Sequence, residues 1–239
     1  MNVDEEGSAG RTAVGWAGRT AAGWAGRTAA GRPVVACDDR GMNDELASHP
    51  DRLRWNARYD RRAALFEPSD LAVTALRNSL PSGPVLELAG GPSGSALAAA
   101  AAGRRVTVVD ISDVALNALA GEAERRGVRP LLEIVHADLE AWRPAAGPYA
   151  LVLCAGYWDR AVFGRAVAAV ADSGLLGWQA LTQAARDARP GLPAAWCLGP
   201  GEPAALLPAG FIVLQDEDVP GTAGTWRRLL ARRQPAMSE

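Results

Sequence analysis

The chain from residue 84 to residue 110 decides the fold, and it contains two apolar stretches: Pro84-Val-Leu-Glu-Leu-Ala-Gly-Gly-Pro-Ser-Gly94 and Arg105-Val-Thr-Val-Val-Asp110. Each stretch is short and rich in Val and Leu, which is typical of a buried strand. The alanine run of residues 96–102 lies between them. Alanine is the best helix former, and Gly103 then predicts the end of a helix. A strand, a helix and a second strand in succession predict the βαβ unit of a parallel sheet.

The same alternation continues on both sides of this unit. Further strands are predicted over residues 131–135, 149–155 and 175–181. Helices are predicted over residues 53–66, 69–80, 112–127, 161–171 and 202–207. Residues 211–216 and 225–231 are predicted to pair as a closing antiparallel hairpin. We therefore predict an α/β fold: a doubly wound, mostly parallel, seven-stranded Rossmann-like sheet with a C-terminal antiparallel hairpin.

The first 41 residues differ from the rest of the chain. From Ala9 to Arg32 the sequence repeats an eight-residue unit: AGRTAVGW, AGRTAAGW, AGRTAAGR. This unit is too short and too rich in glycine to form a repeated structural element. We expect a disordered tail over residues 1–41 and one ordered domain over residues 42–239, with Met42 as a candidate for the true start. An alternative is that Trp16 and Trp24 serve as a short binding tail.

Composition excludes several classes of function. The 239 residues carry 25 basic and 27 acidic side chains, for a net charge of −2, so no nucleic-acid partner is expected. Every basic residue is arginine, which excludes Schiff-base chemistry on lysine. No apolar run approaches the roughly 20 residues that cross a bilayer, and the acidic start is unlike a secretory signal, so we expect no membrane partner and a cytoplasmic location. The three cysteines form no CxxC pair, and no metal site is predicted.

A ligand of such a sheet binds outside the carboxyl ends of the strands. The segments that follow the predicted strands are therefore the candidates for a site. They are the turn Glu87–Gly94, the acid Asp110, the segment Ala137–Leu139 and the segment Cys154–Asp159.

These segments suit an adenosine group without a phosphate clamp. The glycines after the first strand do not match G-x-G-x-x-G, and Pro92 lacks the N–H that a pyrophosphate would use. Asp110 lies 20 residues after Gly90, a spacing typical of an acid that binds ribose hydroxyls, and an acid after the third strand suits an adenine amino group. The pattern indicates S-adenosylmethionine. A nucleotide-dependent oxidoreductase is an alternative that Pro92 and the glycine spacing disfavour.

The motifs VLELAGGPSGSAL, VTVVDIS, HADLEAW and PYALVLCAGYWDR, in this order, resemble those of class I S-adenosylmethionine-dependent methyltransferases. WNARYD at residues 55–60 is similar to the N-terminal signature of a small bacterial subgroup, the tellurite-resistance-type methyltransferases. SGLLGWQALT and GPGEPAALL resemble later elements of the same proteins. The resemblance extends from Trp55 to Arg232.

The resemblance implies a set of cofactor-binding residues. Glu87 would orient the turn and the methionine amino group, Asp110 would bind the ribose hydroxyls, and Asp138 would accept from the adenine amino group. Ser93 stands where the family usually has glycine. The other implied positions are small residues close to the cofactor (Ala89, Gly90, Gly91), side chains beside the adenine (Ile111, Leu139), the segment beneath the methionine (Ala155, Gly156) and a partner for its carboxylate (Arg58).

The sequence says less about the binding site of the methyl acceptor. Tyr157 and Trp158 either line an acceptor pocket or cover the sheet edge. His136 and Asp159 are only positional candidates for a general base, so no catalytic residue is assigned. We therefore expect methyl transfer to a small-molecule acceptor that ionises easily or is a soft nucleophile. The alternative is a protein that binds S-adenosylmethionine or its product without catalysis.

Overall fold

The computed structural model describes residues 46–61, 63–144 and 148–235. The predicted tail over residues 1–41 and the predicted start at Met42 lie outside the described residues. Among the residues that the structure describes, no helix is both long and apolar enough to cross a membrane.

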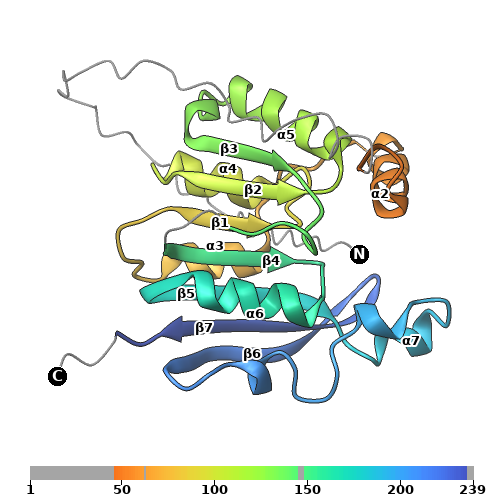
Figure 1. The fold of residues 1–239 in the computed structure, drawn as a ribbon, viewed down its shortest axis with the longest axis vertical. Coiled ribbons are helices and arrows are strands. Elements are labelled where there is room, and N and C mark those ends of the chain that lie inside the picture. Colours follow the sequence, from red (N-terminus) through yellow and green to blue (C-terminus); the bar gives the residue numbers. More distant parts are fainter. Residues whose placement is uncertain (1–45, 62, 145–147, 236–239) are drawn as a thin grey trace, which may run out of the picture. The chain divides into compact units, whose positions relative to one another are not determined.

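Seven strands form one sheet (Figure 1). Their bounds are β1 Val85–Leu88, β2 Val106–Asp110, β3 Leu132–His136, β4 Tyr149–Ala155, β5 Val170–Leu181, β6 Phe211–Gly221 and β7 Gly224–Arg233. The order across the sheet is β3-β2-β1-β4-β5-β7-β6. The first five strands in this order are parallel, and β7 pairs antiparallel with both β5 and β6. The predicted fold class, with its C-terminal hairpin, is confirmed.

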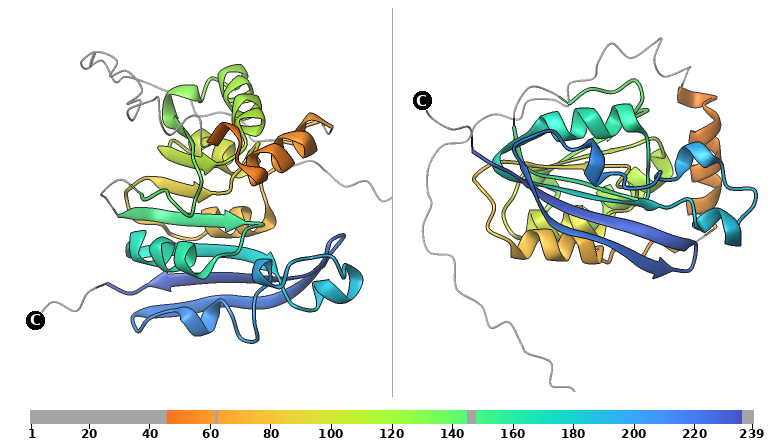
Figure 2. Two further views of the ribbon diagram at one scale, coloured as in Figure 1. Left: turned by 45° about the vertical axis from the view of Figure 1, so that its right-hand side comes forward. Right: turned by 90° about the horizontal axis from the view of Figure 1, so that it is seen from below.

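Helices cover both faces of the sheet (Figure 2). One face packs against α3 (Asp70–Arg77), α4 (Gly94–Ala101) and α5 (Asp113–Arg125), and the other packs against α6 (Arg160–Ala169). Alternate residues of the central strands supply the two cores, as expected for strands buried on both faces. In β5, for example, Leu175 faces the first core and Trp178 faces the second.

Serine or aspartate begins each of the four core helices. Their side chains accept a hydrogen bond from the backbone N–H three residues later, and these caps are Ser69, Ser93, Ser112 and Asp159. A cap satisfies a backbone donor that the helix itself leaves unpaired. The predicted starts at Ser69 and Ser112 are confirmed.

The helix predicted over residues 53–66 was placed wrongly at both ends. The observed helix α2 spans Pro50–Asp60, and residues 63–69 run without regular structure. The close approach of this segment to Gly94 explains the early end. A Cβ at Gly94 would lie 2.3 Å from the carbonyl carbon of Glu67 and 2.5 Å from that of Phe66. The chain therefore crosses the start of α4 in contact, which a helix with its side chains would not permit.

Two other predicted boundaries differ from the structure. The helix predicted over residues 202–207 is only the 3₁₀ turn η3 (Ala204–Leu206), because Glu202 is drawn into bonds with the N–H of Gly199 (2.8 Å) and with Arg160 (2.6 Å). The strand predicted over residues 175–181 begins earlier, at Val170. The pairing of β5 with β4 is irregular there, so the pattern of the first residues is broken.

Candidate functional site

The carboxyl ends of β1 to β4 meet at one edge of the sheet. Leu88, at the end of β1, pairs with Val109 of β2 and Cys154 of β4, and Asp110 pairs with His136 at the end of β3. These strand ends point toward α2 in Figure 1. The structure therefore brings together the four segments that the sequence analysis singled out.

The turn after β1 is so closely packed that only small residues fit. Ala89 and Gly91 have positive φ angles of 51° and 55°, a conformation that favours glycine. A Cβ at Gly90 would lie 2.7 Å from Cγ1 of Val108, and one at Gly91 would lie 2.6 Å from the Tyr59 hydroxyl oxygen. The protein itself therefore excludes larger side chains at residues 90 and 91.

Ser93 connects the buried Glu87 to the start of α4. Its hydroxyl donates to Oε2 of Glu87 (2.6 Å) and accepts from the N–H of Ala96 (2.9 Å). Burial raises the pKa of Glu87 to about 7, against the hydrogen bond from Ser93, and the charge of Asp110 acts in the same direction as burial. Ser93 is thus both a helix cap and a hydrogen-bond donor to the acid at the end of β1.

Asp110 ties the end of β2 to the turn. Its Oδ2 accepts from the N–H of Gly91 (2.8 Å) and its Oδ1 accepts from the N–H of Ser112 (2.7 Å). Burial raises the pKa of Asp110, and these two hydrogen bonds oppose the shift. Each carboxylate oxygen can accept more than one hydrogen bond, so Asp110 retains capacity for a ligand hydroxyl.

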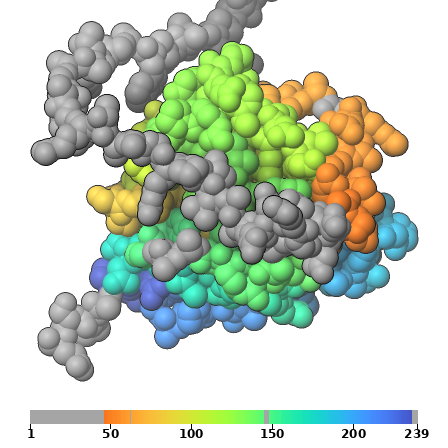
Figure 3. All heavy atoms as spheres, turned by 45° about the horizontal axis from the view of Figure 1, so that its top comes forward, coloured from red at the N-terminus to blue at the C-terminus, as the bar shows by residue number. Residues whose placement is uncertain are grey.

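Four polar side chains dock α2 on the start of α5. Arg52 donates to both carboxylate oxygens of Asp113, at 2.8 and 3.0 Å. Asn56 donates to Oδ1 of Asp113 (2.8 Å) and accepts from the Ser112 hydroxyl (2.7 Å). Figure 3 shows α2, in orange, beside α5, in yellow-green. The partners lie 56 to 61 residues apart in the chain, and sequence reasoning did not connect them.

The segment Ala89–Gly94 after β1 is called the glycine turn below. Tyr59 is the α2 side chain that the structure places against it, at Gly91. Burial raises the pKa of Tyr59 to about 12, and the charge of Asp110 adds to the shift, so the phenol stays neutral. Arg58, which was predicted to meet the cofactor, is exposed, and its guanidinium lies 5.3 Å from the centre of the Trp55 ring. Both residues belong to the WNARYD motif, but the sequence analysis assigned a role only to Arg58 and missed Tyr59.

A second contact joins α2 to the segment that follows β5. The guanidinium of Arg54 lies 4.6 Å from the centre of the Trp196 ring, at the end of the 3₁₀ turn η2 (Ala194–Trp196). A cation over an aromatic face is an attractive pair. The segments before β1 and after β5 therefore contact each other.

The ends of β3 and β4 are more open. Asp138 is half-buried and its Oδ1 accepts from the N–H of Glu140 (2.9 Å), while Leu139 is buried. Ala155 and Gly156 are exposed. Gly156 has a φ of 112°, and a Cβ there would meet no atom within 4 Å. There is room above the end of β4.

The two predicted acceptor-side aromatics have different environments. Trp158 is buried, with its ring centre 5.6 Å from that of Phe163 and 6.2 Å from that of Trp178, so it belongs to the core. Tyr157 is half-buried. Burial raises its pKa, and the nearby carboxylates of Asp159, Glu140 and Asp138 add to the shift. Of the pair, Tyr157 is the residue near the open end of the sheet.

Both positional candidates for a general base make structural hydrogen bonds. Nε2 of His136 donates to the carbonyl of Ile111 (3.0 Å), and Oδ1 of Asp159 accepts from the N–H of Val162 (2.8 Å). The thiol of Cys154 is buried, and burial raises its pKa well above the usual range. Within the described part of the chain, no group of three His, Cys, Asp or Glu side chains is placed to hold a metal ion.

Comparisons with known proteins agree with this architecture. Residues 85–174 match the model of a family described as "Methyltransferase domain". A search of curated proteins finds no match.

Several solved structures share the fold. Magnesium protoporphyrin IX methyltransferase (ChlM) from Synechocystis PCC 6803, solved with bound SAH, has a TM-score of 0.55 at 16% identity, over 69% of this chain and 80% of that one. The glycopeptide N-methyltransferase MtfA, solved with sinefungin, has a TM-score of 0.53 at 19% identity, over 74% and 90%. TehB from Haemophilus influenzae has a TM-score of 0.56 at 14% identity, over 77% and 67%.

The family match spans β1 to the first half of β5 and includes the glycine turn, Asp110 and Asp138. The fold of the neighbours extends over the helices and strands outside that match. Residues 85–174 thus match a methyltransferase-domain family, and the chain shares the fold of methyltransferases solved with SAH and with sinefungin.

Proposed function

We propose that this protein transfers the methyl group of S-adenosylmethionine to a small-molecule acceptor, with the cofactor held along the ends of β1, β2 and β3. The observation that carries the proposal is that backbone N–H groups of the glycine turn already donate hydrogen bonds within the protein. Those of Gly90, Gly91 and Ser93 donate to Val109 O (3.3 Å), Asp110 Oδ2 (2.8 Å) and Gly91 O (3.0 Å). Pro92 has none. A diphosphate needs such donors, and an adenosine bound through its hydroxyl and amino groups needs acceptors.

The side chains at this edge fit that requirement. Glu87, Asp110 and Asp138 all carry acceptor oxygens, which match the ammonium, the ribose hydroxyls and the adenine amino group of the cofactor. In this proposal Ile111 and Leu139 flank the adenine, and Ala155 and Gly156 leave room beneath the methionine part. The close-packed Ala89, Gly90 and Gly91 allow the backbone to come near the cofactor. Tyr59 and Arg58 of α2 cover the methionine side.

When bound, the cofactor supplies an activated methyl group on a positively charged sulfur, with a neutral thioether as the leaving group. The protein's task is to orient the two reactants and to exclude water. Docking of α2 through Arg52 and Asn56 holds Tyr59 over the turn, which removes water from the region between the turn and Asp110. The acceptor then enters from the open side, above the end of β4 and beside Tyr157.

Two features support a small-molecule acceptor. The chain carries 25 basic and 27 acidic side chains, so its net charge of −2 gives no overall attraction to nucleic acid. Among the neighbours, ChlM is a porphyrin methyltransferase and MtfA is a glycopeptide N-methyltransferase. Because His136 and Asp159 make structural hydrogen bonds, the proposed acceptor is one that loses its proton readily or is a soft nucleophile.

A thermal-shift titration of the full chain tests the proposal, with S-adenosylmethionine, S-adenosylhomocysteine, NAD and NADP as ligands. A ligand at a hundred times its Kd adds about 2.7 kcal/mol, which raises Tm by roughly 5–11 °C in a domain of this size. We expect a shift with the two sulfur ligands only. Asp110→Ala should lose the shift, whereas Glu124→Ala, an exposed acid on α5, should keep it.

The cofactor assignment would be overturned if only NAD or NADP raised Tm, or if none of the four ligands raised it. Methyl transfer is then measured with labelled cofactor and a panel of thiols, amines and phenols. Cofactor binding without transfer to any of these would favour the alternative of a non-catalytic binding protein.

A further inference from the structure

The site proposed for S-adenosylmethionine is rich in hydrogen-bond acceptors and poor in donors. Glu87, Asp110 and Asp138 supply carboxylates, which suit the ammonium, hydroxyl and amino groups of the cofactor. The methionine tail of the cofactor also ends in a carboxylate, which these acids repel and which needs a donor of its own. A complete site therefore requires a donor beside the glycine turn.

The backbone of the glycine turn does not supply this donor. Three of the residues 90–93 have an N–H, and all three donate within the protein, whereas Pro92 has none. The next residue, Gly94, is buried at the start of α4, and a Cβ there would lie 2.3 Å from the carbonyl carbon of Glu67. The chain itself thus covers this end of the turn, which leaves side chains as the source of a donor.

Arginine is a common partner of a carboxylate, and α2 carries three arginines. Two of them already have acid partners. Arg52 donates to both carboxylate oxygens of Asp113, and Arg54 is paired with Asp51 (3.0 Å). Neither guanidinium is therefore free for the carboxylate of a ligand.

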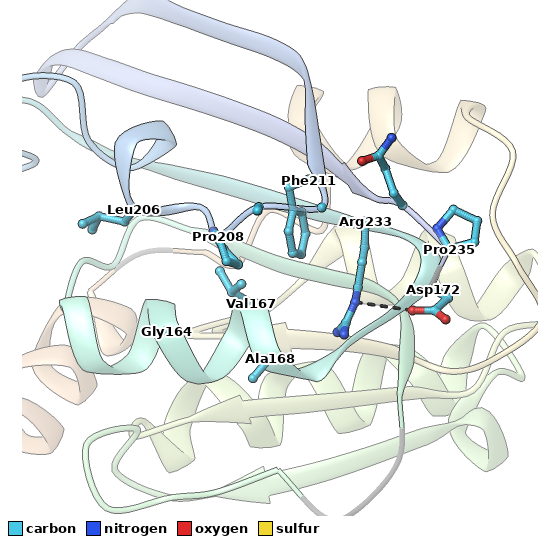
Figure 4. A pocket seen from close by; sticks show the side chains of 12 residues that line it. Gly164, Val167, Ala168, Asp172, Leu206, Pro208, Phe211, Arg233 and Pro235 are labelled. Carbon is cyan, nitrogen blue, oxygen red and sulfur yellow. Dashed lines mark ion pairs between the residues drawn. The ribbon is translucent and has the colours of Figure 1, made fainter. Parts of the chain in front are cut away.

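The hollow of about 680 Å³ between α6 and the start of β6 offers no alternative place for the tail (Figure 4). The arginine that lines it, Arg233, is paired with Asp172 (3.4 Å) and donates to the carbonyl of Val170 (2.8 Å). Most of its other lining side chains are apolar, such as Val167 and Phe211. The charge that a carboxylate would seek in this hollow is already compensated.

Tyr59, by contrast, has a free donor at the glycine turn. A Cβ at Gly91 would lie 2.6 Å from the Tyr59 hydroxyl oxygen and 3.2 Å from its Cζ, so the phenol lies directly against this glycine. The raised pKa of Tyr59, about 12, means that the phenol keeps its proton. Within the described residues, its hydroxyl forms no hydrogen bond. A half-buried donor without an acceptor is costly, and a ligand oxygen would remove this cost.

Neighbouring side chains of α2 hold the Tyr59 ring in this place. The ring stacks on that of Trp55, with ring centres 6.0 Å apart and planes at 29°. Arg58 lies over the same Trp55 ring, 5.3 Å from its centre, so Arg58 supports the stack instead of reaching the turn. Asn56 docks the helix on Ser112 (2.7 Å). The donor is therefore already in position before a ligand binds.

We propose that the Tyr59 hydroxyl donates to the carboxylate of the methionine tail, so that Tyr59 makes the site selective for ligands that retain this carboxylate. The inference rests on the proposed function, because it needs the cofactor at the glycine turn. It gives Tyr59 the role that the resemblance implied for Arg58. A neutral donor suits this place, since a cation there would be attracted to the adjacent Asp110 instead.

Calorimetric titration of the full chain with two ligands tests the proposal. One is S-adenosylhomocysteine, and the other is decarboxylated S-adenosylhomocysteine, which lacks only the carboxylate. Tyr59→Phe should weaken binding of the first at least about tenfold, because a hydrogen bond to a charged group is lost. Its affinity for the second should change less than about twofold. Phenylalanine keeps the ring, so the stack on Trp55 remains.

Two further variants separate Tyr59 from its neighbours. Tyr149→Phe is the matched control: it removes a hydroxyl at the start of β4, the opposite end of that strand from the site, and should bind both ligands like the wild type. Arg58→Met tests the other donor of the motif, and any loss of affinity should be equal for the two ligands.

Three results would overturn the role of Tyr59 and leave the proposed function intact. They are an unchanged affinity of Tyr59→Phe for S-adenosylhomocysteine, an equal loss for both ligands in Tyr59→Phe, and a loss of selectivity for the carboxylate in Arg58→Met alone. A wild-type chain that binds neither ligand would overturn both the role of Tyr59 and the proposed function.

Discussion

At the scale of single residues, the site depends on buried polar groups that hydrogen-bond to one another and to the turn after β1. Glu87, Ser93 and Asp110 are each less than a tenth exposed, and each makes the hydrogen bonds described above. A buried carboxylate is costly unless hydrogen bonds or a proton compensate its charge. Both acids therefore have raised pKa values, and the stability of the fold depends on pH through them.

Glu87 gives this dependence a definite sign. Its pKa is 4.5 when unfolded and about 7 when folded, so the folded state binds the proton more tightly and stability falls as pH rises through this range. The free energy of unfolding of the wild type should therefore fall by about 3 kcal/mol between pH 5 and pH 8. Glu87→Gln should not show this fall. Urea unfolding of both proteins at the two pH values measures it. An equal pH dependence in both would show that Glu87 is not the group responsible.

Ser93 should contribute more than an ordinary helix cap. Ser93→Ala removes the cap of α4, worth about 1 kcal/mol, and also a hydrogen bond to a carboxylate, worth about 1.5–3 kcal/mol at pH 8. The matched control is Ser69→Ala, which removes the cap of α3 but no hydrogen bond to a carboxylate. Urea unfolding should show the larger loss for Ser93→Ala, and Glu87→Gln should reduce it in the double variant. Equal losses for the two serines would count against a link to Glu87.

At the scale of elements, α2 is attached to the domain by polar bonds rather than by core packing. None of its residues is buried, and its main partners are the Ser112 and Asp113 side chains at the start of α5. Elements with little buried apolar surface open at low cost. The cover over the glycine turn is therefore the part of the site that depends most on a few hydrogen bonds.

Asn56→Ala tests this dependence. The change removes the bonds to Asp113 and Ser112, so α2 should lose protection against hydrogen exchange and the affinity for S-adenosylhomocysteine should fall about tenfold, or 1.4 kcal/mol. Global stability should change by less than about 1 kcal/mol, since no core is disturbed. Asn117→Ala, at an exposed position of α5, is the control that should change neither. Unaltered hydrogen exchange in α2 would contradict the conclusion that Asn56 holds this helix on α5.

At the scale of the whole molecule, β7 connects the C-terminal hairpin to both cores. Leu229 belongs to the core on the α6 face, and Leu230 belongs to the core on the opposite face. Both side chains are fully buried. The neighbouring β6, by contrast, has its aliphatic residues exposed. The sheet therefore passes from core to surface between two adjacent strands.

Leu230→Ala should cost about 2–5 kcal/mol of folding free energy, because it leaves a cavity between β7 and the helices of its face. Leu214→Ala, on the exposed edge, should cost less than about 0.5 kcal/mol in the monomer. Urea unfolding at low protein concentration compares the two. Similar losses of folding free energy in the two variants would contradict the exposure of Leu214.

Much of this architecture follows from local patterns. Short runs rich in Val and Leu, alternating with alanine-rich or serine-capped segments, predict the parallel sheet because hydrophobic periodicity and capping act over a few neighbouring residues. The same patterns place Glu87, Asp110 and Asp138 at strand ends, and parallel strands bring their carboxyl ends to one edge. The sequence by itself thus determined the fold class, the hairpin and the candidate edge.

Tertiary structure decided what depends on contacts between distant segments. The end of α2 is set by the approach of residues 66 and 67 to Gly94, and the placement of Tyr59 on Gly91 follows from bonds that span 56 to 61 residues. The burial of Trp158 depends on its packing against Phe163 and Trp178, and the exposure of the β6 aliphatics depends on a bulge. Such contacts are chosen by the packing of whole elements, and the local pattern of residues carries no record of the partner on the other side.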